Sequence, residues 1–318
     1  MGTQINSGQD SDELFRLAFE NANIGMCLVD LNGGLFKVNK QMSNIFGYSQ
    51  QELESMNVND IANHEYKNVS PTFITKAKNG EVEHTVFEKE YIHKNGHVVH
   101  GQVSSSLVRN VAGEPLYFIS HVVDVTEQKH LEEQMRQLAF YDTLTNLPNR
   151  RLLNERLNQT LTASKRTGSY AALMFLDLDN LKILNDIQGH EFGDELLIEV
   201  SNRLRNSVRE IDTIARLGGD EFVVMLSDLS VDRFEAEQNA RAIAEKIRTV
   251  LSEPYLLTIT QEDSTKISSL YQSSASIGIV MFNHEYKSLG DILRWADIAM
   301  YKAKEAGRNT IRIYDESL

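Results

Sequence analysis

The sequence predicts an N-terminal α+β domain built on an antiparallel sheet, a helical linker, and a C-terminal mixed α/β domain. Three observations lead to this fold class. The length of 318 residues favours about two domains, each large enough to bury its own core. The first part of the chain has short alternating strand segments around turn residues, whereas the second part alternates apolar strands with long helical segments. The stretch between them spaces its apolar residues as a helix does.

Composition narrows the classes of partner and the location. With 32 Lys and Arg against 45 Asp and Glu, the net charge is −13, which argues against a binder of duplex nucleic acid, since such proteins need a basic face. No apolar run approaches the roughly 18 residues needed to cross a bilayer, so we expect no membrane insertion and a cytoplasmic location. The single cysteine, Cys27, is expected in the core, which fits a reducing compartment.

The predicted N-terminal domain covers residues 11–125, after a polar segment 1–10 that is expected to be flexible. A helix over 11–22 leads into two strands, IGMCLVD and LFKVN, around the turn signal Asn32-Gly33-Gly34. Short helices are expected around MSNIFGY and QELESM. The remaining strands are expected over about 81–93, 97–109 and 115–125. This order predicts an antiparallel sheet of about five strands with helices on one side.

The N-terminal half resembles a PAS sensor domain, down to its ending Asp124-Val125-Thr126-Glu127. The resemblance implies the fold and leaves the ligand unknown. Candidate ligands of a haem or a metal are His64, His84, His93, His97, His100 and His121. Scattered histidines are more often surface or hydrogen-bonded groups, and a domain that binds nothing and only dimerises is a further alternative. No Asn-Cys-Arg flavin motif occurs, so flavin photochemistry is not expected.

The predicted linker covers residues 126–140 and carries Leu131, Met135 and Leu138 at spacings of 4 and then 3. This spacing is typical of the apolar seam of a two-stranded coiled coil, which predicts a homodimer held by the linker helix and the PAS domain. The alternative is a helix that packs against its own domain, because a seam this short is weak.

The predicted C-terminal domain covers residues 141–318. The stretch AALMFLDLD (171–179) is apolar and then acidic, as a buried central strand that ends at a site is. The sequence ARLGGDEFVVML predicts a hairpin whose two glycines allow positive φ. The other expected elements are helices over 191–208, about 232–252 and 288–305, and a strand over 275–282.

An acidic turn sets the chemistry of this domain. Asp220 and Glu221 follow the two glycines, and Asp177 at the end of a neighbouring strand adds a third carboxylate. Clustered carboxylates repel one another, but Mg²⁺ prefers oxygen ligands of this kind and leaves room for phosphate oxygens. The sequence therefore predicts a magnesium site and a nucleoside triphosphate substrate. When the Asp-x-Asp pair is considered alone, the alternative is that its two carboxylates lie at a strand end in contact with solvent and bind no metal.

Five motifs in order make residues 140–318 resemble the GGDEF diguanylate cyclases. They are DTLTNLPNR (142–150), DLDNLKILND (177–186), GHEFGDELL (189–197), GGDEF (218–222) and YKAKEAGRN (301–309). The resemblance implies synthesis of cyclic di-GMP from two GTP molecules, one held by each of two domains that face one another. The alternative class is a catalytically silent module that binds GTP or cyclic di-GMP and reports it to a partner; such modules usually lose the acidic signature, which this chain keeps.

The resemblance also assigns roles to individual residues. Asp177, the carbonyl of Leu178, Asp220 and Glu221 would hold Mg²⁺ or Mn²⁺, and Glu221 is also the candidate base for the attacking 3′-hydroxyl. Guanine would be read by Asn185 and Asp194, because its ring N–H and amine are paired donors that adenine lacks on that edge. The phosphates would meet Lys182, Lys304 and Arg308. Asn180 and Leu181, where the family commonly has phenylalanine at the second position, would contribute backbone and packing.

A second constellation precedes the acidic turn. Arg209 and Asp212 match the RxxD element by which many members of the family bind their own product at an inhibitory site. The next helix offers Lys246 where relatives often have a second arginine. The lysine ammonium is a point charge, whereas an arginine guanidinium is planar and can bind a phosphate through two hydrogen bonds. We therefore expect weaker inhibition by the product.

Overall fold

The computed structural model describes residues 9–260, 264–285 and 288–315. The expected flexible segment 1–10 lies mostly outside these residues, and its last two residues begin helix α1 (Gln9–Glu20). The chain divides into two compact units, Met1–Glu133 and Gln134–Leu318. Within the described residues, no helix combines the length and the apolar character needed to span a bilayer.

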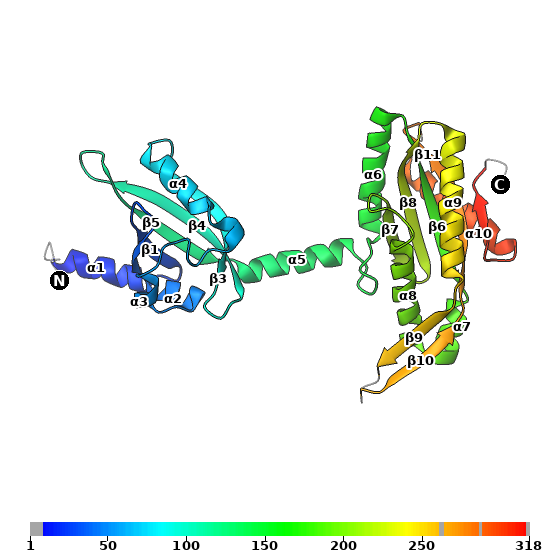
Figure 1. Cartoon of the computed structure of the whole chain (residues 1–318), viewed down its shortest axis with the longest axis horizontal. Coiled ribbons are helices and arrows are strands. Elements are labelled where there is room, and N and C mark those ends of the chain that lie inside the picture. The colour runs from blue at the N-terminus through cyan, green and yellow to red at the C-terminus, as the bar shows by residue number, and fades with distance from the viewer. Residues whose placement is uncertain (1–8, 261–263, 286–287, 316–318) are drawn as a thin grey trace, which may run out of the picture. The chain divides into compact units, whose positions relative to one another are not determined.

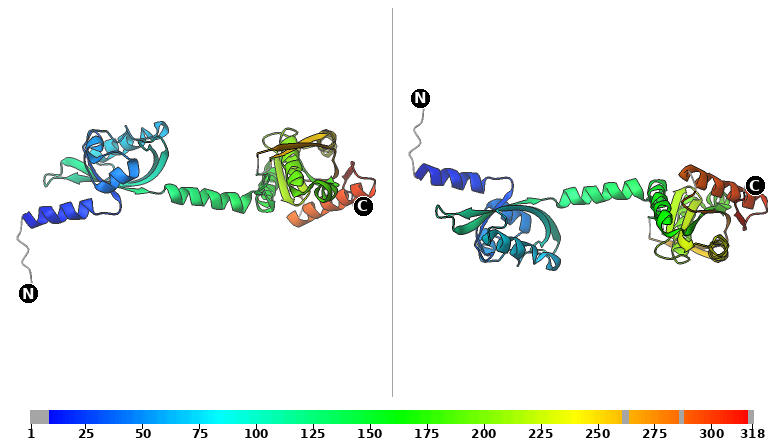
Figure 2. Two further views of the ribbon diagram at one scale, coloured as in Figure 1. Left: turned by 90° about the horizontal axis from the view of Figure 1, so that it is seen from below. Right: turned by 90° about the horizontal axis from the view of Figure 1, so that it is seen from above.

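The first unit is the predicted five-stranded antiparallel sheet, and its strands lie in the order β2-β1-β5-β4-β3 (Figure 1). In Figure 2 the blue and cyan helices α2, α3 and α4 lie on one face of this curved sheet. The strands are β1 (Gly25–Val29), β2 (Leu35–Val38), β3 (His84–Ile92), β4 (Val98–Arg109) and β5 (Pro115–Asp124). The helices after α1 are α2 (Lys40–Phe46), α3 (Gln50–Leu53), the 3-10 turn η1 (His64–Tyr66) and α4 (Val69–Lys78).

A buried asparagine fixes the start of α2. The Asn39 Oδ1 accepts from the backbone N–H groups of Met42 and Met26, and its Nδ2 donates to the carbonyls of Phe19 and Ile24. One side chain thus caps α2 and ties it to β1 and to the end of α1. Helix α4 was not predicted, because Pro71 and a sparse apolar pattern obscure it; Pro71 lies in the first turn, where its missing N–H costs nothing.

Helix α5 (Thr126–Phe140) forms where the linker was predicted. It buries no residue, and the side chains of Leu131, Met135 and Leu138 are 45%, 67% and 68% exposed. These three side chains therefore form an exposed apolar stripe that the described residues of the chain leave uncovered, and the coiled-coil seam stays a prediction.

The second unit is built on a five-stranded sheet in the order β12-β11-β6-β8-β7, antiparallel except for β11 and β12. Its strands are β6 (Tyr170–Asp179), β7 (Thr213–Gly218), β8 (Glu221–Ser230), β11 (Ser274–Phe282) and β12 (Ile311–Ile313), and β9 (Tyr255–Thr260) pairs with β10 (Lys266–Tyr271) in a separate hairpin. The helices are α6 (Arg150–Thr167), α7 (Leu181–Gln188), α8 (His190–Arg205), α9 (Arg233–Leu251) and α10 (Leu289–Glu305).

Alternation along β6 explains the layers of this unit. Ala172, Met174 and Leu176 belong to the core that includes residues of α8 and α9, whereas Leu173 and Phe175 belong to the core that includes residues of α6 and α10. Because successive side chains point to opposite faces, a strand covered on both faces must be apolar throughout. The run of hydrophobic residues in β6 therefore follows from its central place, and its first acidic side chains come where the strand ends.

Candidate active site

Three strand ends bring the predicted acidic residues together. In the pairing of β6 with β8, Asp177 lies directly opposite Glu221, and in the pairing with β11 it lies opposite Ser276. The backbone N–H of Leu178 donates to the carbonyl of Asp220 at 3.2 Å. The end of β6 and the turn between β7 and β8 are thus bonded to each other, so that Asp177, Asp220 and Glu221 share one edge of the sheet.

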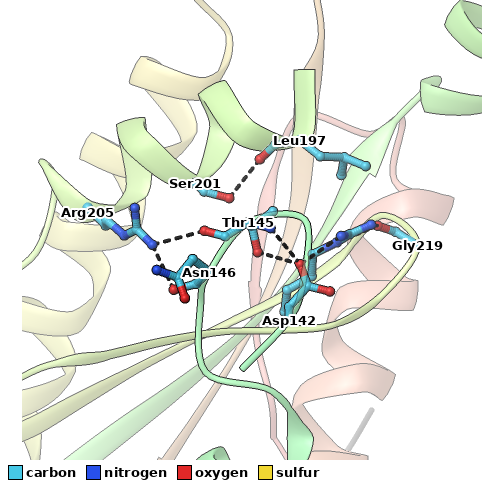
Figure 3. Close-up of polar contacts among 8 residues, drawn as sticks. Asp142, Thr145, Asn146, Leu197, Ser201, Arg205 and Gly219 are labelled. Carbon is cyan, nitrogen blue, oxygen red and sulfur yellow. Dashed lines mark hydrogen bonds and ion pairs between the residues drawn. The ribbon is translucent and has the colours of Figure 1, made fainter. Parts of the chain in front are cut away.

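The glycine turn adopts the conformation that the sequence predicts. Gly218 has φ 144° and Gly219 has φ 52°, both in the region that favours glycine. The turn, whose Gly219 is labelled in Figure 3, is held from one side, where the guanidinium of Arg216 donates from Nε and Nη2 to the carbonyl of Gly219, at 3.1 and 2.8 Å. Arg216 is buried and Gly219 is exposed, so these bonds anchor an exposed turn to a buried side chain.

Asp142 holds this arginine in place. Its Oδ1 accepts from Arg216 Nη1 at 2.9 Å, and also from the backbone N–H and the hydroxyl of Thr145 (Figure 3). Burial acts to raise the pKa of Asp142, but these hydrogen bonds and the Arg216 charge outweigh it and lower the pKa. Arg205 in turn donates to the carbonyls of Thr145 and Asn146. The segment just after α5 is therefore tied through Asp142 and Arg216 to the turn that carries Asp220.

Asp177 occupies an electrostatically strained place. The residue is 7% exposed, and burial raises its pKa to about 6, with the nearby charges of Asp220 and Asp179 adding to the shift and Lys304 opposing it. Its Oδ2 lies 2.7 Å from the Lys304 Nζ. A carboxylate that is buried among other carboxylates needs a cation, and here the ammonium of Lys304 supplies part of that charge.

The donor set is of the kind that holds a divalent metal ion together with a phosphate ligand. Among the residues that the structure describes, no three His, Cys, Asp or Glu side chains form a cage that could hold a metal ion. Mg²⁺ is usually bound by one or two carboxylates together with water and substrate phosphates, rather than by a cage made of protein alone. The carboxylates of Asp177 and Asp220 and the backbone carbonyl of Leu178, at this end of the sheet, match that requirement.

Asp179 supports the site, although sequence reasoning assigned it no role. Its carboxylate accepts from the hydroxyl of Ser276 at 2.9 Å and from the backbone N–H of Asn309 at 3.2 Å, and it is 3% exposed. These bonds fasten the turn after α10 to the end of β6, and that turn carries Gly307 and Arg308, both at positive φ. The alternation Asp-Leu-Asp at 177–179 was the available signal, since it places both carboxylates on the same face of the strand.

The predicted guanine readers lie on the helix pair α7 and α8. A Cβ built at Gly193 would collide with Asn185 Oδ1, so a larger residue there would displace the Asn185 side chain. Asn185 Oδ1 is buried and has no hydrogen-bond partner among the described residues, and Asp194, which follows Gly193 in the chain, is exposed. A buried unpaired acceptor is costly and is often completed by a ligand.

The remaining predicted contacts surround this edge. Asn180 begins α7 in the left-handed conformation at φ 69° and its carbonyl accepts from the Tyr271 hydroxyl; Leu181 is buried. The side chains of Lys182 and Arg308 are exposed, whereas Lys304 is half-buried against Asp177.

Comparison with known proteins decides the family. The model of the family described as "Diguanylate cyclase, GGDEF domain" matches residues 139–310, more than half of the chain. The chain belongs to the GGDEF family. A model of the PAS fold matches residues 13–125, so a PAS domain precedes the GGDEF domain, as predicted.

The relatives found include multidomain signalling proteins. MucR of Pseudomonas aeruginosa, described as a bifunctional diguanylate cyclase/cyclic di-GMP phosphodiesterase, is 40% identical over 195 residues, which are 61% of this chain and 26% of MucR. The signaling protein YkoW of Bacillus subtilis is 28% identical over 317 residues, 98% of this chain and 36% of YkoW. The chain thus spans about a quarter to a third of these relatives. The solved coiled coil and GGDEF domain of DgcB from Caulobacter crescentus, in complex with c-di-GMP, matches with a TM-score of 0.50 and 25% identity, covering 59% of this chain and 93% of that one.

The predicted inhibitory residues of the GGDEF domain lie together at the loop before β7. Asp212 is buried, and its Oδ2 accepts from the backbone N–H of Arg209 at 3.0 Å and lies 3.7 Å from the Arg209 Nε. Lys246 on α9 donates to the carbonyl of Ser207 at 2.9 Å. The Arg209 side chain is 54% exposed. Asp212 therefore fixes the loop, while the Arg209 guanidinium and the Lys246 ammonium are accessible to solvent.

Proposed function

We propose that the GGDEF domain condenses two GTP molecules into cyclic di-GMP and two pyrophosphates. The observation that carries this proposal is the meeting of Asp177 with the Gly-Gly-Asp-Glu turn at one sheet edge, with Lys304 at 2.7 Å from Asp177. Family membership supports the same chemistry. Because GTP is the substrate, we place the reaction in the cytoplasm.

Asp177, the Leu178 carbonyl, Asp220 and Glu221 would hold Mg²⁺ or Mn²⁺. A bound ion would supply positive charge that offsets the charge developing on the displaced pyrophosphate. Lys304, which pairs with Asp177 in the structure, would contact a phosphate oxygen, and the exposed Lys182 and Arg308 would contact the same phosphates. Glu221 accepts the proton of the attacking 3′-hydroxyl or completes the ligand set.

Guanine recognition rests on Asn185 and Asp194. A carboxylate at position 194 accepts from both the ring N–H and the amine of guanine, and adenine cannot satisfy it, so GTP is preferred over ATP. We expect a non-hydrolysable GTP analogue to bind in calorimetry, and Asp194→Ala to weaken it by about 10- to 100-fold through loss of a charged acceptor. Asp297→Ala, an exposed change on α10, is the matched control. Equal binding of GTP and ATP analogues would contradict this assignment.

Product inhibition is proposed to act through Arg209, Asp212 and Lys246. Arg209→Ala should leave the initial rate unchanged and relieve the slowing of progress curves as cyclic di-GMP accumulates. Removing a charged donor should weaken product binding by about 10- to 100-fold. The control is Arg241→Ala, an exposed arginine paired with Glu237 on α9. Identical progress curves for Arg209→Ala and wild type exclude this site.

We propose that the chain works as a parallel homodimer joined through α5 and the PAS domain, since each catalytic domain carries one GTP and reaction needs two domains face to face. One residue inserted between Gln134 and Met135 turns everything beyond it by about 100°, whereas seven nearly restore the phase. We expect a large change in activity for the single insertion and near wild-type activity for seven. If both variants remain dimeric by light scattering and have equal activity, α5 is a passive tether.

A further inference from the structure

The two carboxylates at the end of β6 have different surroundings. Asp177 meets the ammonium of Lys304, whereas the groups that donate to Asp179 are uncharged. The Asp179 Oδ1 accepts from the hydroxyl of Ser276 at 2.9 Å. Its Oδ2 accepts from the hydroxyl of Ser274 at 2.5 Å and from the backbone N–H of Asn309 at 3.2 Å. Both oxygens of this buried carboxylate thus serve hydrogen bonds within the domain.

The turn after α10 has an unusual backbone. Arg308 has φ 62° and Asn309 has φ 42°, directly after Gly307 at φ 108°. Residues other than glycine rarely adopt the left-handed region, and asparagine tolerates it better than arginine does. Such a conformation persists where the surrounding structure holds it, so the contacts of this turn decide which way its side chains point.

Three hydrogen bonds hold the turn. The N–H of Arg308 donates to the carbonyl of Ala303 at 3.2 Å, which closes the end of α10. The side chain of Asn309 accepts from Arg248 Nη1 on α9 at 3.1 Å, in an exposed position. The N–H of Asn309 donates to the carboxylate of Asp179, which is 3% exposed. Of these three bonds, the last one links the turn to β6, and it does so through a buried group that serine hydroxyls fix from the other side.

The turn presents an arginine beside the acidic edge of the sheet. The side chain of Arg308 is exposed, and it follows by one helical turn Lys304, whose Nζ lies 2.7 Å from Asp177. The direction of a side chain is set by the φ and ψ of its own residue, because these angles place the Cβ. The left-handed conformation of Arg308 therefore decides whether its guanidinium can reach a phosphate held next to Asp177.

We propose that Asp179 is a positioning residue for phosphate recognition. By accepting from the N–H of Asn309, its carboxylate keeps Arg308 in the left-handed conformation that directs the guanidinium toward the triphosphate. Asp179 itself contacts neither the nucleotide nor the metal. The inference rests on the proposed function, because GTP is the ligand whose phosphates Arg308 meets. It gives the two carboxylates of one Asp-x-Asp pair separate tasks.

A double-mutant cycle in the full chain tests this inference, with the affinity for a non-hydrolysable GTP analogue and Mg²⁺ measured by calorimetry. Asp179→Ala should weaken binding by about 10-fold or more, and Arg308→Ala should do the same. The double variant should bind within about twofold of the weaker single variant, because both changes remove the same contact. A loss that merely reflects a loosened structure would multiply with that of Arg308→Ala. Asp297→Ala, an exposed change on α10, should bind as wild type does.

Two results would overturn the inference: unchanged affinity in Asp179→Ala, or losses that multiply in the double variant. If Asp179→Ala does not fold, Asp179→Asn keeps the shape and removes the charge, and it should weaken binding by roughly 3- to 10-fold, with no further loss when Arg308→Ala is added. Unchanged affinity in Asp179→Asn counts against the inference equally. The proposed function fails separately, when wild type binds no GTP analogue, whereas binding and turnover by wild type with no effect of the Asp179 variants contradict this inference alone.

Discussion

Asp177→Asn should lower the rate of cyclic di-GMP formation by about 1,000-fold or more, because it removes a charge that the metal and the phosphates require, and several kcal/mol of stabilisation correspond to several powers of ten. Asparagine keeps the shape of the side chain. The assay is product formation at saturating GTP and Mg²⁺, with Asp297→Asn on the exposed face of α10 as the matched control. Activity within tenfold of wild type would remove Asp177 from the site.

The same variant separates a functional role from a structural one. Burial and neighbouring carboxylates raise the pKa of Asp177 from 3.8 to about 6, so the folded domain holds an extra proton between these values. Its stability therefore falls as pH rises through that window. Asp177→Asn cannot titrate, so the unfolding midpoint of its metal-free GGDEF domain should lack this fall and should equal or exceed that of wild type at pH 7. A strongly lowered midpoint contradicts this account of the charge.

Asp142→Ala should reduce turnover by about 10- to 100-fold, although Asp142 lies outside the acidic cluster. Its carboxylate holds Arg216, which holds the Gly219 carbonyl beside Asp220 (Figure 3). Removing Asp142 leaves the buried Arg216 without its ion-pair partner and shifts the turn, and small displacements of a reacting group are costly. Binding of GTP should fall less than turnover, since Asn185 and Asp194 on α7 and α8 are not part of this network.

The control for Asp142 is Glu237→Ala, which breaks an exposed ion pair with Arg241 on α9. Exposed pairs contribute little, so its kinetics should match wild type. If Asp142→Ala and Glu237→Ala both leave kcat and KM for GTP unchanged, the network does not position the turn. If Asp142→Ala loses binding and turnover in equal measure, its effect is not confined to the catalytic step.

The acidic half of the site could be predicted because its signals are local. An apolar run that ends in acidic residues, and glycines that precede acidic residues, identify the end of β6 and the turn before β8. The hydrogen-bond network of Asp142 and Arg216 could not be predicted, because these residues are 74 positions apart in the chain and only the fold brings them together. The motif containing Asp142 was noticed, but nothing in it says which residue its carboxylate meets.

Three further features were not predicted from the sequence, each for a different reason. Helix α6 begins at the capping Asn149 and ends before Gly168, and both signals were available in the sequence. The hairpin of β9 and β10 has mostly exposed, weakly alternating residues, so periodicity gives little warning of it. Lys89 is buried and shares the inward face of its strand with Phe87 and Tyr91, and a charge at such a position was the available signal of a special environment.

The measurement that tests the central claim most directly is identification of the products made by the purified chain from GTP and MgCl₂, using liquid chromatography with mass spectrometry and a pyrophosphate assay. We predict that the chain makes cyclic di-GMP and releases two pyrophosphates for each cyclic di-GMP formed. Both products should be lost when Mg²⁺ is chelated, and ATP should give little product. Absence of cyclic di-GMP over a range of protein and Mg²⁺ or Mn²⁺ concentrations, while GTP still binds, would contradict the account and indicate a nucleotide-binding module that does not turn over.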